Sequence, residues 1–173
     1  MASIRHATAR DASAIAEVHV ASWRWAYRDV VPEAALDELD VHERERMWSG
    51  WLDEETAGAE ALVAEDRDEV VGFCSYGPSR DHGVTPATGE VYTLYLREEM
   101  AGHGVGRELF AQANERLRAL GYERATLWVL ASNARTRKFY EAARWSADGT
   151  TGAHHIAGDT LPIVRYAIDL PPD

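Results

Sequence analysis

The sequence contains a single cysteine, Cys74, and this scarcity excludes several kinds of protein. One thiol can form neither a disulfide framework nor a metal site built from several cysteines. The chain also has no apolar run long enough for a secretory signal peptide or a membrane-spanning helix. We therefore expect a reducing, cytoplasmic setting and no membrane partner.

Basic residues are also scarce, with 18 Lys and Arg against 29 Asp and Glu and a net charge of −11. Nucleic-acid binding needs a basic face, so we expect no nucleic-acid partner. Residues 32–69 hold 14 acidic and three basic residues, an excess as large as that of the whole chain. This segment either attracts a cationic substrate or is a solvated surface that keeps the protein in solution.

The length and composition fit one globular unit. A chain of 173 residues can build one domain with a hydrophobic core but is short for two. Hydrophobic residues make up 46% and charged residues 27%, as in ordinary globular proteins. The chain shows no repeat, low-complexity segment or linker. We expect a single domain over residues 1–173.

The front half predicts short elements that end in a hairpin. They are a strand at 3–8, a helix after a Thr8–Asp11 pair that resembles a capping box, helices at 33–39 and 41–52, and strands at 60–65 and 69–76. The helix after Asp11 places Ile15, Val18, Ser22 and Trp25 on one face. These strands should pair as an antiparallel sheet.

The back half predicts a strand–helix–strand unit. It comprises a Gly- and Pro-rich loop at 77–89, a strand at 90–96, a helix to about Leu120 that Gly121 ends, a strand at 125–130, a helix at 134–143 and a strand at 163–170. The strand at 125–130 is a nearly continuous apolar run, which is typical of a buried parallel strand. The pattern predicts an α/β fold with an antiparallel front half.

The stretch MAGHGVGREL, residues 100–109, places three glycines directly before the long helix. The first N–H groups of a helix have no partner within it, and the helix dipole adds positive potential, so such a turn can hold a phosphate. The Rossmann pattern needs glycine at 107, where Arg107 stands, and the Walker A pattern is absent. The alternative is a tight strand-to-helix turn without a ligand.

These residues resemble the acyl-CoA pyrophosphate loop of the GNAT superfamily of N-acetyltransferases, Arg/Gln-x-x-Gly-x-Gly/Ala. Gly104 and Gly106 take the glycine positions, whereas Ala101 departs from the leading Arg/Gln. The likeness continues in SNARTRKFYEAARW, which is similar to the family's Asn-x-x-Ala-x-x-Phe-Tyr segment. Asn133 and Tyr140 match it, 27 and 34 residues after Gly106. The combination of loop and segment carries the resemblance.

The resemblance implies a fold and a cosubstrate. The implied sheet is mixed and mostly antiparallel, with flanking helices and a splayed parallel pair formed by 90–96 and 125–130. Acetyl-CoA would lie in the gap between these two strands, and no metal is implied. The residues that the resemblance assigns to acetyl-CoA binding are Leu94, Tyr95, Leu96, Gly102, His103, Gly104, Val105, Gly106, Arg107 and Asn133.

The resemblance also implies catalytic roles. Tyr140 would donate a proton to the leaving CoA thiolate, and its alternative is a core tyrosine. Glu90 would act as a general base through water, and its alternative is an ordinary glutamate at a strand start. An N–H near Tyr95 would stabilise the oxyanion. Asn133 either positions the cosubstrate or caps the helix together with Ser132.

The remaining candidates are interpreted as structural or as walls of the acceptor pocket. His154 and His155 lack a defensible metal-ligand spacing in their expected loop and line the acceptor side or meet solvent. Cys74 is expected to be a buried strand residue. The aromatic residues of the front helices should be mostly core, with one or two of them walling the acceptor pocket; they are Trp23, Trp25, Tyr27, Trp48 and Trp51.

The implied activity is direct transfer of an acetyl group from acetyl-CoA to a primary amine of a small, cationic acceptor. One alternative is an acetyltransferase for protein N-termini or lysines. Another is a module that binds acyl-CoA without catalysis. Besides the small-molecule amine, a second copy of the chain is the one protein partner we consider, in a homodimer.

Overall fold

The computed structural model describes residues 2–53, 58–156 and 158–172 and contains a mixed sheet of seven strands. The strand order is β1-β2-β3-β4-β5-β7-β6. The strands are β1 Ser3–His6, β2 Glu60–Asp66, β3 Glu69–Pro78, β4 Thr88–Leu96, β5 Arg124–Leu130, β6 Ser146–Ile156 and β7 Asp159–Asp169. All neighbours pair antiparallel except β4 and β5, which are parallel. The predicted fold class is confirmed.

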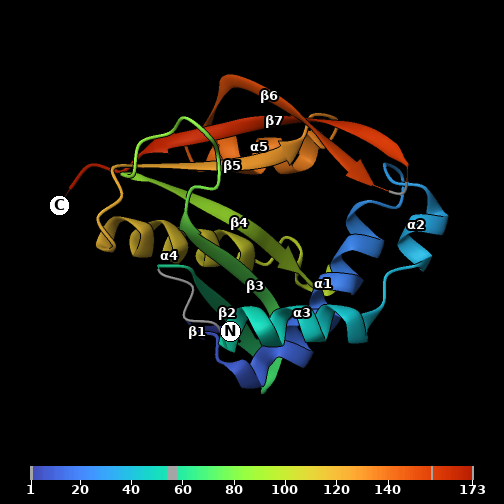
Figure 1. Ribbon diagram of the computed structural model, residues 1–173. Helices are drawn as coiled ribbons and strands as arrows, with labels where there is room; N and C mark the ends of the chain where they lie inside the picture. The colour runs from blue at the N-terminus through green and yellow to red at the C-terminus, as the bar shows by residue number, and fades with distance from the viewer. Residues whose placement is uncertain (1, 54–57, 157, 173) are drawn as a thin grey trace.

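Within the described ranges, five α-helices and two 3₁₀ turns connect and cover the strands (Figure 1). They are η1 Ala9–Asp11, α1 Ala12–Ala26, α2 Glu33–Asp37, α3 Val41–Asp53, η2 Glu98–Met100, α4 Val105–Ala119 and α5 Ala134–Ala142. Side chains of α1 and α3 pack with Val63 and Phe73 on one face of the sheet. Side chains of α4 and α5 pack on the other face, with Leu62 and Leu127.

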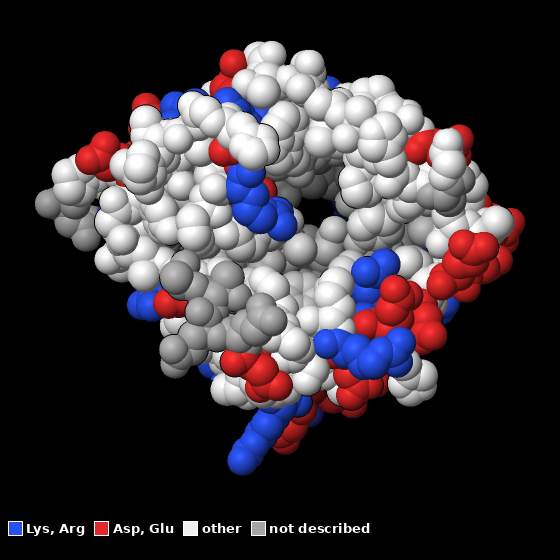
Figure 2. Space-filling model, viewed as in Figure 1, with Lys and Arg blue, Asp and Glu red and all other residues white. Residues whose placement is uncertain are grey.

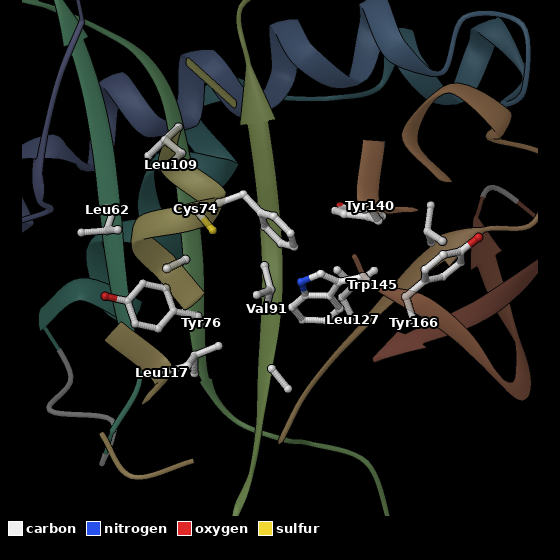
Figure 3. Close-up of a cluster of buried hydrophobic side chains, with 14 of the residues drawn as sticks. Leu62, Cys74, Tyr76, Val91, Leu109, Leu117, Leu127, Tyr140, Trp145 and Tyr166 are labelled. Atoms are coloured by element: carbon white, nitrogen blue, oxygen red, sulfur yellow. The ribbon is translucent and has the colours of Figure 1, made fainter. Parts of the chain in front are cut away.

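The core on the face of α4 and α5 joins both halves of the sheet. Figure 3 shows Leu62 and Cys74 on one side of β4 and Trp145 and Tyr166 on the other. Trp145 and Tyr166 are each 1% exposed, and Cys74 is fully buried, as predicted. This shared core holds the halves together where their strands separate.

Capping residues set the ends of the helices that border the site. The Thr8–Asp11 capping box is present, and it precedes α1 through η1. Gly104, with φ of +85°, is the N-cap of α4, and Gly121, with φ of +91°, follows its C-cap. Both conformations favour glycine, which confirms why the sequence places it there. Leu120, the C-cap, is 41% exposed.

One strand was missed in the prediction of the back half. Residues 146–156 form β6, so His154 and His155 lie in a strand and not in a loop, and β7 begins at Asp159 and not at 163. β6 is an edge strand, and most of its residues are exposed. Its sequence, SADGTTGAHHI, therefore lacks the alternation of apolar and polar residues on which strand prediction depends.

Candidate active site

The parallel strands β4 and β5 separate soon after they meet. Their pairing covers three residue pairs and ends at Glu90 and Thr126, although β4 continues to Leu96 and β5 to Leu130. Figure 1 shows the two strands diverging towards their C-terminal ends. The predicted splayed pair is present, and its gap opens between the two halves of the sheet.

An extra residue in β4 accompanies this separation. Thr93 pairs with Ser75 and Val91 pairs with Tyr76, so that Tyr92 has no pairing partner in β3 and forms a β-bulge. Bulges bend a strand and increase its twist. The Tyr92 hydroxyl donates to the carbonyl of Pro78 at 2.6 Å. A Cβ at Gly77 would lie 2.7 Å from this hydroxyl, so glycine is required beside the bulge.

The register also shows which main-chain groups of β4 face the gap. The N–H of Arg97 donates to the carbonyl of Val71, so alternate residues such as Tyr95 bond β3. The N–H and C=O groups of Leu94 and Leu96 therefore point away from β3 and into the gap. This direction agrees with the roles predicted for Leu94 and Leu96. It gives no support to an oxyanion role for the Tyr95 N–H, which points at β3.

A cavity of about 1140 Å³ occupies this gap. Its walls come from β4, β5, the glycine stretch, α5, the end of α1 and the hairpin of β6 and β7. Figure 2 shows a hollow on this face of the molecule, with basic side chains at its rim. The cavity thus runs between the two faces of the sheet.

The glycine stretch lines one end of the cavity with unused N–H donors. In the described chain, the N–H groups of residues 104–107 have no hydrogen-bond acceptor, as expected at a helix start. Gly102 and Gly104 both have positive φ, and a Cβ at Gly106 would lie 2.9 Å from a methyl of Leu96. Glycine at 106 therefore lets α4 begin close against β4.

The side chains predicted around this loop lie in different environments. His103 and Arg107 are exposed and line the cavity, and the N–H of His103 donates to Met100 O at 3.4 Å. Val105 is buried in the core, so its side chain has a structural role. Asn133 also lines the cavity, and its side chain accepts a hydrogen bond from the Thr136 N–H at 3.2 Å. The capping interpretation of Asn133 is confirmed.

Tyr140 of α5 lies in the cavity wall. It is 7% exposed, packs against Phe110 at 5.2 Å between ring centroids, and lines the cavity. Burial raises the pKa of the Tyr140 hydroxyl well above its ordinary value, and the neighbouring Tyr27 raises it further. Tyr140 is therefore protonated at neutral pH, the state that a proton donor requires.

Glu90 lies beside the cavity but does not belong to its described lining. The residue is 3% exposed. One carboxylate oxygen accepts from the Arg80 N–H at 2.8 Å, and the other accepts from the Arg80 guanidinium at 3.0 Å. The structure thus shows Glu90 as the buried partner of Arg80, and its role as a general base stays a prediction.

Aromatic side chains wall the cavity on the side of α1. Trp23 and Tyr27 are 4.8 Å apart between ring centroids, and both line the cavity together with Trp25. His154 of β6 lies 6.4 Å from Trp23 and lines the same end. Trp48 is instead a core residue, 4% exposed. The front segment supplies both core and pocket aromatics, but the prediction that most of them are core was wrong: Trp23, Trp25 and Tyr27 line the cavity, whereas Trp48 and Trp51 pack in the core.

Arginines dominate the charges of the cavity. Among its described lining residues, the charged side chains are Arg28, Arg80, Arg107, Arg135 and Asp29. The described residues of the acidic segment 32–69 do not line it. The acidic residues that are concentrated in this segment therefore do not surround the cavity, and the solvated-surface interpretation fits them.

Sequence reasoning missed three of these arginines, Arg28, Arg80 and Arg135. Arg80 lies two residues after the end of β3, and Arg135 lies with its guanidinium carbon 4.9 Å from the Trp25 ring centroid. The position of Arg135, two residues after Asn133, was the available signal. Arg80 had no such signal, because its cavity neighbours come from β4 and β5.

No group of three His, Cys, Asp or Glu side chains among the described residues could hold a metal ion. None of the described helices has the length and apolar character needed to cross a membrane.

Comparison with known proteins places this geometry in context. The model of the acetyltransferase (GNAT) family matches residues 14–144. An N-acetyltransferase of Bacillus subtilis (strain 168), YuaI, itself uncharacterized, is 33% identical over 142 residues, which cover 82% of this chain and 79% of YuaI. The mycothiol acetyltransferase of Saccharopolyspora erythraea is 32% identical over 145 residues, 82% of this chain, but the match spans only 43% of that longer protein.

Solved structures share the fold. The PaiA N-acetyltransferase from Thermoplasma acidophilum, in complex with coenzyme A, has a TM-score of 0.75 at 20% identity and is covered over 98% of its length by 95% of this chain. YncA from Salmonella typhimurium, with its cofactor acetyl-CoA, has a TM-score of 0.75 at 19% identity, with 100% of this chain and 96% of YncA covered. At these identities the likeness concerns the fold alone.

Proposed function

The chain belongs to the GNAT family of acetyltransferases, and from this premise we propose that it moves an acetyl group from acetyl-CoA directly to a primary amine of a small molecule. One observation carries the proposal: a single cavity joins the free N–H groups of the glycine stretch to Tyr140 and to an aromatic end on the side of α1. Donor and acceptor can then meet inside the gap of the sheet, and such positioning supplies much of the rate enhancement.

The residues of the gap fit an acyl-CoA cosubstrate. Unused N–H groups at 104–107 suit a diphosphate, and the exposed Arg107 adds positive charge beside them. The main-chain groups of Leu94 and Leu96 can hydrogen-bond an extended amide chain as a neighbouring strand would. When bound, acetyl-CoA supplies an acetyl group activated as a thioester.

The proposed chemistry assigns one proton to Tyr140. Its hydroxyl is neutral and buried at the cavity wall, so it can donate a proton to the departing thiolate. An N–H of Leu94 or Leu96, directed into the gap, would stabilise negative charge on the thioester oxygen. Glu90 can take the proton of the amine only through water, because it is buried outside the cavity lining and both of its oxygens already accept a hydrogen bond from Arg80.

The narrower proposal of a cationic acceptor now depends on other residues than the acidic segment. Asp29 is the one carboxylate among the described lining residues. The aromatic faces of Trp23 and Tyr27 can also attract an ammonium group, by about 0.5–2 kcal/mol. A charged amine can therefore be held at this end before it loses its proton.

The substitution Tyr140→Phe tests the proposal, because it removes one oxygen and retains the ring. A general acid contributes about 10²–10⁴-fold to the rate. Since a CoA thiolate is already a good leaving group, we expect kcat to fall by about 10²-fold, the low end of that range. Acetyl-CoA affinity, measured by calorimetry, should stay unchanged. The activity is measured as CoA release over a panel of primary amines.

Tyr122→Phe is the matched control, because Tyr122 is half-buried and lies outside the cavity lining. It should leave kcat unchanged. A near-normal kcat for Tyr140→Phe, with chemistry rate-limiting, would remove Tyr140 from the mechanism. Acetyl-CoA binding without turnover of any amine would favour the binding module, and turnover of peptides alone would favour a protein acetyltransferase.

A cytoplasmic location and a homodimer are further parts of the proposal. The single, buried thiol of Cys74 suits a reducing compartment. The exposed edge strand β6 offers a surface on which a second copy could pair. Sedimentation of the purified chain measures the assembly state.

A further inference from the structure

Arg80 presents a cation at the cavity from an unusually well-held position. Its guanidinium carbon lies 4.1 Å from the Tyr92 ring centroid, and one of its nitrogens lies 3.0 Å from a carboxylate oxygen of Glu90. The Arg80 side chain is 66% exposed, whereas that of Glu90 is 4% exposed. A buried anion thus anchors an exposed cation that lines the cavity.

The loop that carries Arg80 is fastened to the second half of the sheet. The next residue, Asp81, accepts one hydrogen bond from the Trp128 indole and one from the Arg165 guanidinium, both at 2.9 Å. The side chains of Asp81 and Arg165 are only 18% and 16% exposed. The position of Arg80 is therefore set before a ligand arrives, which reduces the entropy lost on binding.

Most N–H donors of the Arg80 guanidinium have no acceptor among the described residues. A guanidinium carries five N–H donors in a fixed fork. One of its nitrogens donates to Glu90, and no other acceptor of this guanidinium exists among the described residues. The free side of the fork matches the two oxygens of a carboxylate, which arginine binds in a bidentate manner.

Arg80 lies across the sheet from the glycine stretch. Leu127 and Val129 of β5 pack with α4 and α5, so Trp128 between them points to the opposite face. Trp128 bonds Asp81, which places the loop of Arg80 on that opposite face. A phosphate at residues 104–107 would thus lie on the other side of the sheet, and Arg80 is left to contact the acceptor.

We propose that Arg80 binds a carboxylate of the acceptor, so that the substrate is a small amine that also carries a carboxylate, as an amino acid does. This inference rests on the acetyl transfer proposed above. Glu90 is then a positioning residue, because it holds Arg80 rather than touching the reacting atoms. Asp29 and the aromatic end near Trp23 and Tyr27 receive the ammonium group, while Arg80 receives the carboxylate.

Matched acceptor pairs test the proposal. Leucine, phenylalanine and lysine are compared with leucinamide, phenylalaninamide and lysinamide, with kcat/KM calculated per neutral amine. A hydrogen bond to a charged group is stronger than one between neutral groups, so we expect the acids to be preferred by about 10- to 100-fold. Arg80→Gln should remove this preference by raising KM for the acids, and the amides should change by less than about threefold.

Three further variants and readouts separate the explanations. Arg116→Gln is the control, since Arg116 also pairs with a glutamate, Glu60, but does not line the cavity. It should retain the preference. Glu90→Gln should weaken the preference for acids by raising KM for the acids more than for the amides. A general base would instead lose kcat for acids and amides alike. Acetyl-CoA affinity should be the same with and without Arg80→Gln.

The results that overturn the inference are distinct from those that overturn the proposed function. Equal use of acids and amides by the unmodified protein would overturn it, as would an equal loss for both in Arg80→Gln. A weaker acetyl-CoA affinity in Arg80→Gln would assign this residue to the donor site. Turnover of carboxylate-free amines alone would overturn the inference and leave acetyl transfer standing. If no amine of the panel raised CoA release above the rate without amine, both the inference and the proposed function would be overturned.

Discussion

Lowering the pH from 7 to 4 should destabilise the protein through one buried side chain, His19 of α1. His19 is 8% exposed, and its Nδ1 accepts a hydrogen bond from the Trp48 indole at 3.1 Å. Its ring stacks on Tyr95 at 5.2 Å between centroids. Protonation would place a second donor opposite the indole N–H and a charge among aromatic rings.

The magnitude follows from the pKa of His19. Burial, with a smaller contribution from the charge of Arg44, lowers this pKa from 6.5 to about 4. Between these two values the unfolded chain binds a proton that the folded protein excludes, so stability rises with pH across this window. The contribution is complete above pH 6.5, decreases as the pH falls, and is lost at pH 4. Its full size is about 3 kcal/mol, at 1.36 kcal/mol for each pH unit.

Urea unfolding at pH 7, 6, 5 and 4, followed by far-ultraviolet circular dichroism, measures this effect. Other groups also titrate in this range, so the comparison is with His19→Gln, which keeps an acceptor for Trp48 but carries no titrating group. The free energy of unfolding should fall by about 3 kcal/mol more in the unmodified protein than in the variant. His42→Gln, at an exposed histidine, is the control and should behave as the unmodified protein does.

Parallel pH dependences for the unmodified protein and His19→Gln would refute this reasoning. The result matters for the site, because Tyr95 lines the cavity and stacks on His19. Loss of activity below pH 5 would otherwise be assigned to a catalytic group. The stability measurement separates an unfolding cause from a catalytic one.

Two further predictions concern ligand binding. Gly104→Asp should weaken acetyl-CoA binding at least tenfold more than Gly104→Asn, because both substitutions strain the backbone at φ of +85° but only aspartate adds a charge beside the diphosphate. Calorimetry on the folded variants measures the two affinities. Equal affinities would show that the diphosphate does not bind at this loop. Because the described residues of 32–69 do not line the cavity, kcat/KM should fall with ionic strength no more steeply for a cationic acceptor than for a neutral amine of similar size; a steeper fall for the cation would show that these carboxylates attract it.

The sequence predicted the elements that have strong local signals. The helix α4 combines glycine at both ends with a buried apolar stripe, and β5 is a nearly continuous apolar run after Arg124. The strand β6 has neither signal. It lies at the edge of the sheet, so its register depends on pairing with β7 and not on burying its own side chains. Main-chain pairing with the next strand leaves little pattern in side chains that stay exposed.

The candidate site was predicted on the donor side more fully than on the acceptor side. The glycine stretch and the segment from Asn133 to Tyr140 are motifs of neighbouring residues, and such motifs can be recognised from the sequence alone. Arg80 reaches the cavity because Asp81 bonds Trp128, which is 47 residues away. No pattern among neighbouring residues predicts a contact between segments so far apart in the sequence. The acidic segment shows the reverse case: its carboxylates are close together in the sequence, but the described ones do not line the cavity.

The gap itself is a departure from regular sheet geometry, and its causes lie in particular residues. Gly77 leaves room for the Tyr92 hydroxyl, which bonds Pro78 and supports the bulge that accompanies the separation of β4 from β5. The separation leaves the main-chain groups of Leu94 and Leu96 without a strand partner. Unpaired main-chain groups are unfavourable unless water or a ligand satisfies them. The same irregularity that weakens the sheet therefore creates the hydrogen-bonding edge that an extended acyl-CoA can complete.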